Sequence, residues 1–209
     1  FIVSSTDFSS LDLHPDLLKN LATLGYQSMT PIQQLSLPAI LSGKDVIGQG
    51  KTGSGKTAAF GLGLLQKLDV KSFKAQSIVL CPTRELADQV AAEIRKLARA
   101  IHNIKVLTLC GGAPFGPQIG SLEHGVHIVV GTPGRIEEHL RKGTLKLGSI
   151  TTLVLDEADR MLDMGFQDTI DEIIEKIPSK RQTLLFSATF PNEIASIAER
   201  VMQNPTMVE

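Results

Sequence analysis

The chain of 209 residues contains no tryptophan, one tyrosine and two cysteines, and its formal net charge is −1. Two cysteines offer too few ligands for a structural zinc site. The near-zero net charge means that a nucleic-acid partner would need a local basic patch. The longest apolar runs are much too short to span a membrane. Hydrophobic residues still make up 42% of the chain, which is ordinary for one substantial globular core.

The few residues that suggest redox or metal chemistry are better explained by structural roles. Cys81 and Cys110 each close an apolar run, which is typical of buried, reduced thiols and predicts a cytoplasmic location. The first five residues, FIVSS, have neither the basic nor the long apolar region of a secretory signal peptide. We expect structural or surface roles for the five histidines, which fall in no motif: His14, His102, His124, His127 and His139.

Short apolar runs rich in Val, Ile and Leu alternate with longer amphipathic stretches along the chain. The patterns predict strands at 45–49, 77–81, 105–110, 127–130, 152–155, 183–186 and 206–208. They predict helices at 31–41, 56–68, 86–101, 115–123, 135–142, 166–177 and 192–202. Because parallel strands need crossover helices, this alternation predicts an α/β fold with a mostly parallel central sheet and helices on both faces. Without repeats or an evident linker, residues 1–209 are expected to form a single domain.

Six unusual strings directly follow strand candidates. In chain order they are GKTGSGKT, PTRELA, GG, TPGR, DEAD and SAT. Ligands of open α/β sheets bind beyond the carboxyl ends of the strands. The six strings are therefore expected to share one edge of the sheet as an active site.

The segment GQGKTGSGKT contains Gly-Lys-Thr twice, but only the second copy fits a phosphate-binding loop. That loop requires a glycine six residues before its lysine, which is Gly50 for Lys56 but Asp45 for Lys51. We expect Lys56 to reach the β- and γ-phosphates, the amides of residues 53–57 to hold phosphate oxygens, and Lys51 to lie in solvent. The alternative is a glycine-rich turn before a helix. The predicted nucleotide contacts in the loop are Gly50, Thr52, Gly53, Ser54, Gly55, Lys56 and Thr57.

Two carboxylates follow the apolar run TTLVL, where a P-loop enzyme places its second magnesium contact. We expect Thr57 and Asp156 to bind Mg²⁺, Asp156 through water. Glu157 is then placed to polarise an attacking water as a general base. The predicted catalytic residues are thus Lys56, Asp156 and Glu157. Alternatively, the two acids are solvated groups at a strand end that cap the next helix.

These six strings, in this order, resemble the first RecA-like domain of the DEAD-box RNA helicases. Gly25-Tyr26 and the string TPIQ at 30–33 resemble the Q motif of that family, here within residues 1–40, with Phe8 as its isolated aromatic residue. The resemblance covers essentially the whole chain. Strings such as LTLCGGAPFG and RQTLLFSAT are most similar to the bacterial DbpA-type subgroup. The resemblance implies a RecA-like P-loop NTPase domain that binds ATP, Mg²⁺ and RNA.

The resemblance also assigns an adenine site. Gln33 would read adenine through its carboxamide, Phe8 would lie against the adenine face, and Tyr26 would pack beside the base. Each residue has an alternative explanation in the sequence. Gln33 would otherwise be a surface glutamine at a helix start, Phe8 a core residue, and Tyr26 a support for the loop.

For RNA, the resemblance implies contacts to phosphates and 2′-hydroxyls without sequence preference. The implied contacts are Pro82, Thr83, Arg84, Gly111, Gly112, Thr132, Pro133, Gly134 and Arg135. Alternatively, Arg84 forms an ion pair at a helix start, with Glu85 or with an acid of DEAD, and Arg135 is a solvated charge in a first helical turn. Hydrogen bonds from Ser187 and Thr189 to Asp159 would couple the nucleotide and RNA sites.

The family has a second RecA-like domain in cis, whose arginine-rich HRxGRxGR string does not occur in this sequence. We therefore expect this chain, as a monomer, to bind ATP or ADP weakly, to hydrolyse slowly at best and not to unwind RNA. The whole protein would remodel RNA, with ribosomal RNA in ribosome assembly as the implied setting. The alternatives are a DNA-directed helicase or another P-loop ATPase, and a module that clamps RNA without turnover. The family usually has Ala in place of Gly50, so Gly50→Ala is expected to keep or slightly improve nucleotide binding.

Overall fold

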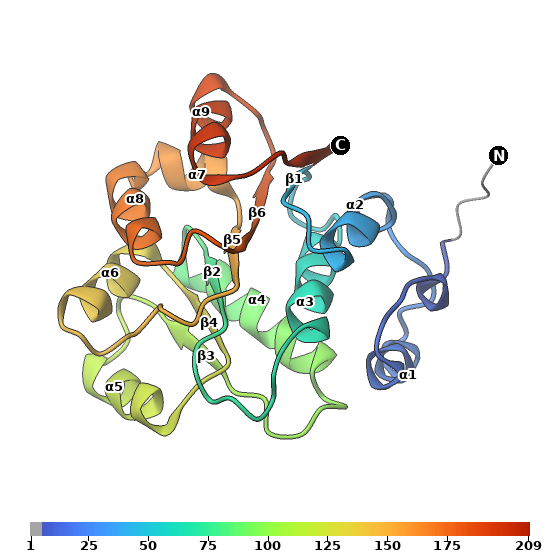
Figure 1. Cartoon of the computed structure of the whole chain (residues 1–209), viewed down its shortest axis with the longest axis horizontal. Coiled ribbons are helices and arrows are strands. Elements are labelled where there is room, and N and C mark those ends of the chain that lie inside the picture. The colour runs from blue at the N-terminus through green and yellow to red at the C-terminus, as the bar shows by residue number, and fades with distance from the viewer. Residues whose placement is uncertain (1–5) are drawn as a thin grey trace.

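A computed structural model describes residues 6–209, and the five residues in which no signal peptide was expected lie outside the described part of the chain (Figure 1). The described residues form one seven-stranded sheet in the order β3-β4-β2-β5-β6-β1-β7, in which every neighbouring pair is parallel. The strands are β1 (Val46–Gln49), β2 (Ser77–Leu80), β3 (Val106–Leu109), β4 (Ile128–Gly131), β5 (Thr152–Leu155), β6 (Gln182–Ser187) and β7 (Thr206–Val208). The predicted strands and the α/β fold class are confirmed.

Helices connect the strands. They are α1 (Pro15–Thr23), α2 (Pro31–Leu41), α3 (Lys56–Gln66), α4 (Arg84–Leu97), α5 (Phe115–His124), α6 (Pro133–Arg141), α7 (Ala158–Asp163), α8 (Gln167–Glu175) and α9 (Asn192–Val201), preceded by a 3₁₀ turn at Phe8–Ser10. The helix at 84–97 begins two residues before its predicted start because Thr83 caps it, its hydroxyl accepting a hydrogen bond from the Leu86 amide at 3.2 Å. Helices α1 and α7 were not predicted.

The sheet separates two hydrophobic clusters. Helices α1–α4 cover one face and α5–α9 the other, as the right and left sides of Figure 1 show. Successive strand residues alternate between the two: Val79 belongs to the first cluster, and Ile78 and Leu80 to the second. The prediction of a sheet buried on both faces is confirmed.

The two cysteines are buried, as the apolar runs before them predicted. Cys81 and Cys110 are buried free thiols, and burial raises the pKa of Cys110 to about 11. No cluster of His, Cys, Asp and Glu within residues 6–209 could hold a metal ion by itself. None of the helices in that range combines the length and apolar character needed to cross a membrane.

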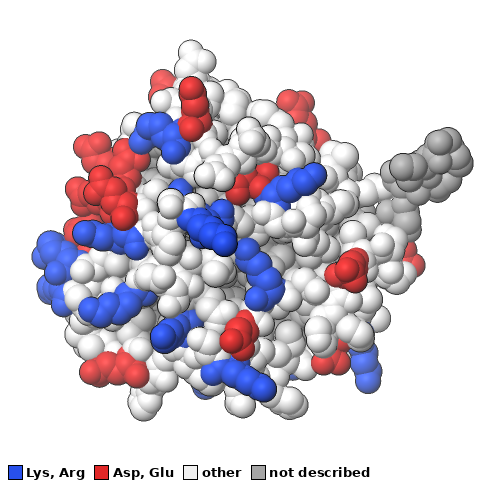
Figure 2. Space-filling model, in the orientation of Figure 1, with Lys and Arg blue, Asp and Glu red and all other residues white. Residues whose placement is uncertain are grey.

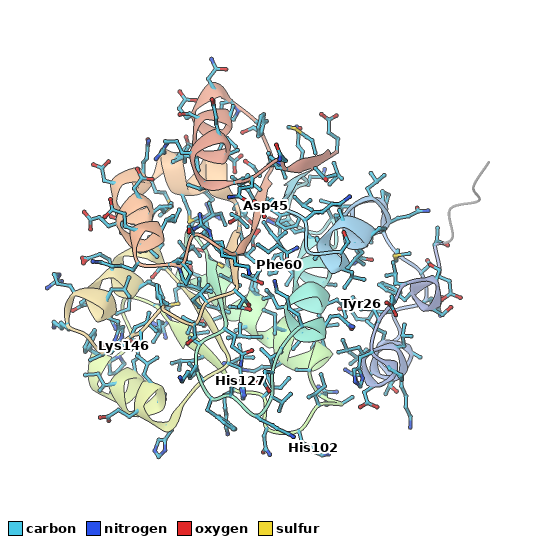
Figure 3. The ribbon with its side chains drawn as sticks, viewed as in Figure 1. Tyr26, Asp45, Phe60, His102, His127 and Lys146 are labelled. Carbon is cyan, nitrogen blue, oxygen red and sulfur yellow. The ribbon has the colours of Figure 1, made fainter. Side chains whose placement is uncertain are left out.

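The parallel arrangement gives the sheet two chemically different edges. The six motif strings all lie at the edge where strands end. The loops that lead into strands lie at the opposite edge, where Figure 3 labels Asp45, His127 and Lys146. In Figure 2, Lys and Arg side chains gather over the centre and lower left of the face in view, whereas several Asp and Glu side chains cluster at its left margin.

Candidate active site

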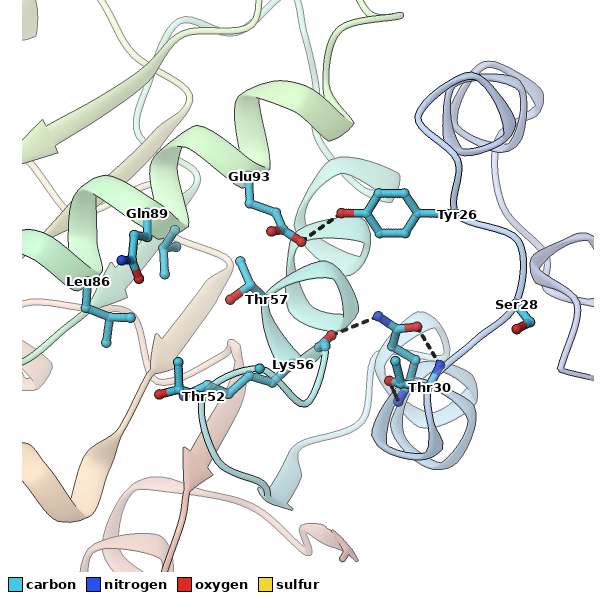
Figure 4. Close-up of a pocket in the computed structure, with 13 residues that line it drawn as sticks. Tyr26, Ser28, Thr30, Thr52, Lys56, Thr57, Leu86, Gln89 and Glu93 are labelled. Carbon is cyan, nitrogen blue, oxygen red and sulfur yellow. Dashed lines mark hydrogen bonds between the residues drawn. The ribbon is translucent and has the colours of Figure 1, made fainter.

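A cavity of about 390 Å³ lies between the phosphate-binding loop, α4 and the segment that leads into α2 (Figure 4). It is lined by Tyr26, Ser28, Thr30, Gln33, Thr52, Gly53, Gly55, Lys56, Thr57, Leu86, Gln89, Val90 and Glu93. The volume is in the range of small-molecule sites. The cavity thus joins the Q-motif segment to the loop, as the sequence predicted.

Two glycines give the loop its shape. Gly53 and Gly55 have φ angles of +88° and +89°, which residues with a side chain rarely adopt. A Cβ on Gly55 would also lie 2.6 Å from Nε2 of Gln33 and 2.7 Å from Oγ1 of Thr30. Helix α3 then begins at Lys56, so its free amides and positive dipole end face the cavity. Lys51 is exposed, as predicted.

Lys56 meets the two carboxylates that follow β5. Its Nζ lies 2.7 Å from Oδ1 of Asp156 and 3.3 Å from Oε2 of Glu157, and its side chain is only 3% exposed. The lysine that would hold phosphate is therefore occupied by carboxylate oxygens in this structure. The predicted catalytic lysine is thus in direct contact with both predicted catalytic carboxylates.

Asp156 has a carboxylate that its surroundings do not fully satisfy. Its side chain is completely buried, and neither oxygen has a well-aligned hydrogen-bond donor despite the nearby Lys56. Burial raises the pKa of Asp156, and the attraction of Lys56 opposes that rise only in part. Beside the Lys56 ammonium, this buried carboxylate has acceptor capacity left for a cation or for the water of a hydrated cation.

The residues fit Mg²⁺ on these grounds. Thr57 lines the cavity with its hydroxyl, and Asp156 supplies the unsatisfied carboxylate, so both are oxygen ligands of the kind Mg²⁺ prefers. Since the described residues offer no larger acidic cluster, the other ligands would be water and phosphate oxygens. This is the usual way in which proteins bind magnesium with a nucleotide.

Glu157 has a strained backbone conformation, and its surroundings favour the ionised carboxylate. Its φ and ψ are +52° and +53°, a left-handed conformation that costs a non-glycine residue about 1–3 kcal/mol. Oε2 accepts a hydrogen bond from Oγ1 of Thr52 at 2.9 Å, and Oε1 accepts one from Arg160 at 3.4 Å. Partial burial raises the pKa of Glu157, but these bonds and the charge of Lys56 outweigh it and lower the pKa overall. Arg160 was not predicted, because nothing local in the sequence marks it.

Gln33 is a buried connection between α2 and the loop. Its Oε1 accepts a hydrogen bond from the Thr30 amide at 2.9 Å, and its Nε2 donates one to the Gly55 carbonyl at 3.0 Å. The Thr30 hydroxyl in turn accepts from the Gln33 amide, which completes a capping box at the start of α2. With 3% of its surface exposed, Gln33 is not the surface residue that the alternative proposed. Its contact with adenine stays a prediction.

The two aromatic residues of the predicted adenine site have different surroundings. Tyr26 lines the cavity, and its hydroxyl donates a hydrogen bond to Oε2 of Glu93 at 2.9 Å. Phe8 is 3% exposed, belongs to the hydrophobic core and packs edge-on against Tyr26. Phe8 does not line the cavity and occupies the core position of the alternative, so its contact with the base stays a prediction. Glu93 was missed because it looks like one more polar position of α4.

The loops predicted to contact RNA lie together. Oγ1 of Thr132 accepts a hydrogen bond from the Gly111 amide at 3.4 Å, and a Cβ on Gly112 would lie 3.5 Å from a guanidinium nitrogen of Arg84. The three loops after β2, β3 and β4 are thus neighbours. Gly111, Gly112 and Gly134 are exposed, whereas Pro82 and Pro133 are buried and shape the loops from within.

The surroundings of Arg84 and Arg135 do not match the alternative explanations given for these residues. Arg84 is half exposed and lies 3.9 Å from Asp88, so its ion pair is neither with Glu85 nor with an acid of DEAD. Arg135 is only 14% exposed, which excludes a solvated charge. It donates hydrogen bonds to the carbonyl of Ala113 at 2.8 Å and to Oε1 of Gln118 at 3.1 Å.

Gln118 connects Arg135 to a buried histidine. Its Oε1 lies 2.7 Å from Nε2 of His139, whose Nδ1 lies 2.7 Å from Oγ1 of Thr144. The His139 ring stacks on Phe115 at 4.0 Å, and burial lowers its pKa. The GG and TPGR loops are therefore held as one unit. No signal in the sequence identified Gln118, since this network exists only after α5 and α6 pack.

The SAT string contacts DEAD in two ways. Oδ2 of Asp159 accepts hydrogen bonds from the amide and the hydroxyl of Thr189 at 3.1 and 2.9 Å. Ser187 also bonds Asp159, as expected. Its hydroxyl accepts a hydrogen bond from the Asp159 amide at 3.3 Å and donates one to the Thr189 carbonyl at 2.6 Å. Partial burial raises the pKa of Asp159, but the bonds from Thr189 outweigh it and lower the pKa overall.

The parallel sheet, the glycine loop at the start of α3 and the lysine–carboxylate cluster define a RecA-like P-loop nucleotide-binding domain. The family model of the DEAD/DEAH box helicases matches residues 30–197, and the chain belongs to this family. It is 62% identical over 205 residues to the ATP-dependent RNA helicase DbpA of Escherichia coli (strain K12), covering 98% of this chain and 45% of that protein. It is 49% identical over 203 residues to the ATP-dependent RNA helicase CshA of Listeria monocytogenes, covering 97% of this chain and 39% of that protein.

The fold is also similar to that of a solved DEAD box protein. The crystal structure of a DEAD box protein from the hyperthermophile Methanococcus jannaschii superposes with a TM-score of 0.94 at 38% identity, covering 99% of this chain and 56% of that one. The resemblance read from the motifs is confirmed. The chain spans less than half the length of these two curated relatives.

Proposed function

We propose that this chain is the ATP- and RNA-binding core domain of an ATP-dependent RNA helicase. The contact of Lys56 with Asp156 and Glu157 beside the cavity supports this most directly. It brings together, at one edge of the sheet, the residues that would serve as phosphate ligand, magnesium ligand and general base. The neighbouring loops, with their exposed glycines, would supply the surface for RNA.

Nucleotide binding would redistribute charge within this cluster. Phosphate oxygens would draw the Lys56 ammonium from its carboxylate partners, because they carry more charge and accept several hydrogen bonds. Asp156 would then be free to hold a hydrated Mg²⁺ together with Thr57, and the ion would neutralise charge on the phosphates. Glu157, ionised and released by Lys56, would accept a proton from the attacking water.

RNA binding would use backbone amides and hydroxyls of the loops after β2, β3 and β4. Arg84 is only loosely paired and is available to a phosphate. These groups suit the backbone and the 2′-hydroxyls, so binding would be independent of base sequence. The bonds between Asp159 and Thr189 would transmit the state of the nucleotide site to the loop after β6.

A second RecA-like domain in cis would complete the enzyme, which the greater length of the relatives supports. An arginine finger supplied by such a domain contributes about 10³–10⁵ in rate. This chain alone, as a monomer, would therefore bind nucleotide and hydrolyse it very slowly without unwinding. The whole protein would remodel ribosomal RNA during ribosome assembly in the cytoplasm, a setting suggested by the DbpA-type resemblance.

The test is single-turnover hydrolysis and binding of a fluorescent ATP analogue by the chain, with single-stranded RNA or DNA of matched sequence. We expect Glu157→Gln to keep nucleotide affinity and to lose the residual hydrolysis, while Glu175→Gln on α8 changes neither. A binding module without turnover would show no effect of Glu157→Gln. Equal or stronger binding of DNA would favour a DNA-directed helicase instead.

A further inference from the structure

A second groove lies at the edge of the sheet where strands begin, opposite the nucleotide cavity. It encloses about 350 Å³, and its lining includes Phe73, Lys74, Leu122, Val126, Leu145 and Lys146. None of the described residues that line it carries a carboxylate. The groove therefore combines apolar walls with positive charge, and none of the helicase motifs reaches it.

Phe73 is a partly exposed aromatic residue whose position is fixed by its neighbours. Its side chain is 43% exposed, and its ring packs at 4.6 Å on the buried ring of His127. Nδ1 of His127 accepts a hydrogen bond from the Lys105 amide, so Nε2 carries the proton that is donated to the Val70 carbonyl. A Cβ on Gly125 would lie 2.8 Å from that of Phe73, so only glycine allows this close approach.

The loop that carries Phe73 is fixed from its other end as well. Oε1 of Gln76 accepts a hydrogen bond from the Asp69 amide at 2.9 Å. Nε2 of the same side chain donates to the carbonyls of Asp69 and Ser72, both at 2.8 Å. An exposed aromatic ring on a loop with this many internal bonds is pre-organised for contact, which lowers the entropic cost of binding.

The two lysines of the groove have no acidic partner within residues 6–209. Lys74 and Lys146 are exposed, and no ion pair involves either of them. Arg141 and Lys142, at the end of α6, are by contrast paired with glutamates of the same helix. Two unpaired cations therefore lie together in the lining of the groove.

Helix α6 connects this groove to the predicted RNA edge. Arg135 lies in its first turn at the TPGR loop, and Thr144, just after its end, lines the groove. A helix of nine residues is about 13 Å long, so the two sites are separated by a short span of single strand. Between them, Phe115 lies beneath the cations of Arg135 and Lys142, at 5.4 and 4.6 Å from its ring centre.

We propose that the groove is an accessory site for single-stranded RNA, in which a base stacks on Phe73 and the adjoining phosphates meet Lys74 and Lys146. A basic groove with an aromatic platform is the combination that holds unpaired nucleic acid without sequence preference. An acidic peptide would satisfy the lysines but would leave the phenyl face without a planar partner. The inference rests on the proposed RNA binding of this domain.

The experiment measures binding of labelled oligouridylates of five and twelve nucleotides to the chain by fluorescence anisotropy, without nucleotide and at several salt concentrations. We expect Lys74→Ala/Lys146→Ala to weaken binding of the longer strand more than that of the shorter. Losing two phosphate contacts should reduce the slope of log K against log[salt] by about 1.4. Phe73→Leu should weaken the longer strand about fivefold through lost stacking. The matched control is Lys19→Ala/Lys44→Ala, which removes two exposed lysines elsewhere and should leave both strands unaffected.

The outcomes separate this site from the proposed function. If the parent binds RNA and the Lys74→Ala/Lys146→Ala variant binds with unchanged affinity and slope, the accessory site is wrong and RNA binding at the motif edge stands. If the parent binds neither strand, both proposals fail. If a polyglutamate peptide binds through Lys74 and Lys146 while RNA binding ignores them, the groove is a peptide site and the RNA assignment is overturned.

Discussion

The ammonium group of Lys56 lies 2.7 Å from Oδ1 of Asp156, and neither side chain is open to solvent. In this state the carboxylate takes the place that a phosphate oxygen would occupy beside the lysine. The pair keeps both charges inside the protein compensated until a more highly charged ligand arrives. Its removal should therefore affect both stability and binding.

Lys56→Ala should abolish binding of ATP and lower the free energy of unfolding by about 3 kcal/mol at pH 8, because it leaves the Asp156 charge buried without a partner. Lys51→Ala is the matched control in the same loop, and its exposed side chain should contribute to neither property. Titration with a fluorescent ATP analogue and urea unfolding measure the two effects. A reversed result for the two lysines would overturn the assignment of the phosphate lysine.

Two glycines of the loop differ in how strictly they are required. The backbone conformation at Gly55 requires glycine, whereas at Gly50 only contacts with nearby side chains oppose a larger residue. Gly55→Ala should lose ATP binding, because its φ of +89° and the close Gln33 and Thr30 side chains leave no room for a methyl group. A Cβ on Gly50 would meet only Cδ1 of Ile32 at 2.6 Å and Oγ of Ser54 at 3.0 Å.

Gly50→Ala should therefore retain ATP affinity within about threefold and change stability by less than about 1.5 kcal/mol, provided that the end of Ile32 moves aside. Adding Ile32→Val removes the methyl group that the new Cβ meets, so the double variant should recover stability relative to Gly50→Ala. Thermal unfolding of the single and double variants tests this. The clash is not with Ile32 if the second substitution gives no recovery.

The sequence predicted the parts of the site that depend on order along the chain. The strand–loop–helix context was sufficient to choose Lys56 over Lys51. The surroundings of Gln33 and Arg135 could not be predicted, because their partners, the Gly55 carbonyl and Gln118, are brought near only by tertiary packing. For the same reason, local polarity favoured a surface position for both side chains.

Helix α1 was missed although its sequence contains helical signals. Pro15 opens the helix, and Leu17 and Leu21 are buried one turn apart. The segment gains its position from Asn20, whose side chain donates hydrogen bonds to the carbonyls of Lys96 and Leu97 at the end of α4. That contact across the fold has no counterpart in the local pattern.

Thr189→Val should weaken the link between β5 and β6 in a pH-dependent way. Loss of the hydroxyl bond to the Asp159 carboxylate should cost about 1 kcal/mol at pH 7. The folded pKa of Asp159 lies below its value in the unfolded chain, about 3.9, so this stabilisation is present above that pH. It is lost as the pH falls through the lowered folded pKa.

Urea unfolding at pH 7 and pH 3 should therefore show a larger difference between parent and Thr189→Val at the higher pH. Thr23→Val is the control, because the Thr23 hydroxyl bonds a backbone carbonyl of α1 and no acid. Its effect should be the same at both values. An equal effect of Thr189→Val at pH 7 and pH 3 would show that Asp159 is not the group concerned.

Gln118→Leu should reduce RNA affinity severalfold and leave ATP affinity unchanged. The substitution removes the oxygen that accepts a hydrogen bond from Arg135 and lies 2.7 Å from His139 Nε2. The guanidinium then keeps its hydrogen bond to the Ala113 carbonyl and its ion pair with Glu138 but loses its hydrogen bond to α5. None of these residues lines the nucleotide cavity. Gln167→Leu, at the exposed start of α8, controls for a general effect of replacing glutamine by leucine. Binding curves for RNA and for ATP, measured on the same variants, test whether only RNA affinity falls. A matching loss of ATP affinity would indicate that the network supports the whole fold and not the RNA loops in particular.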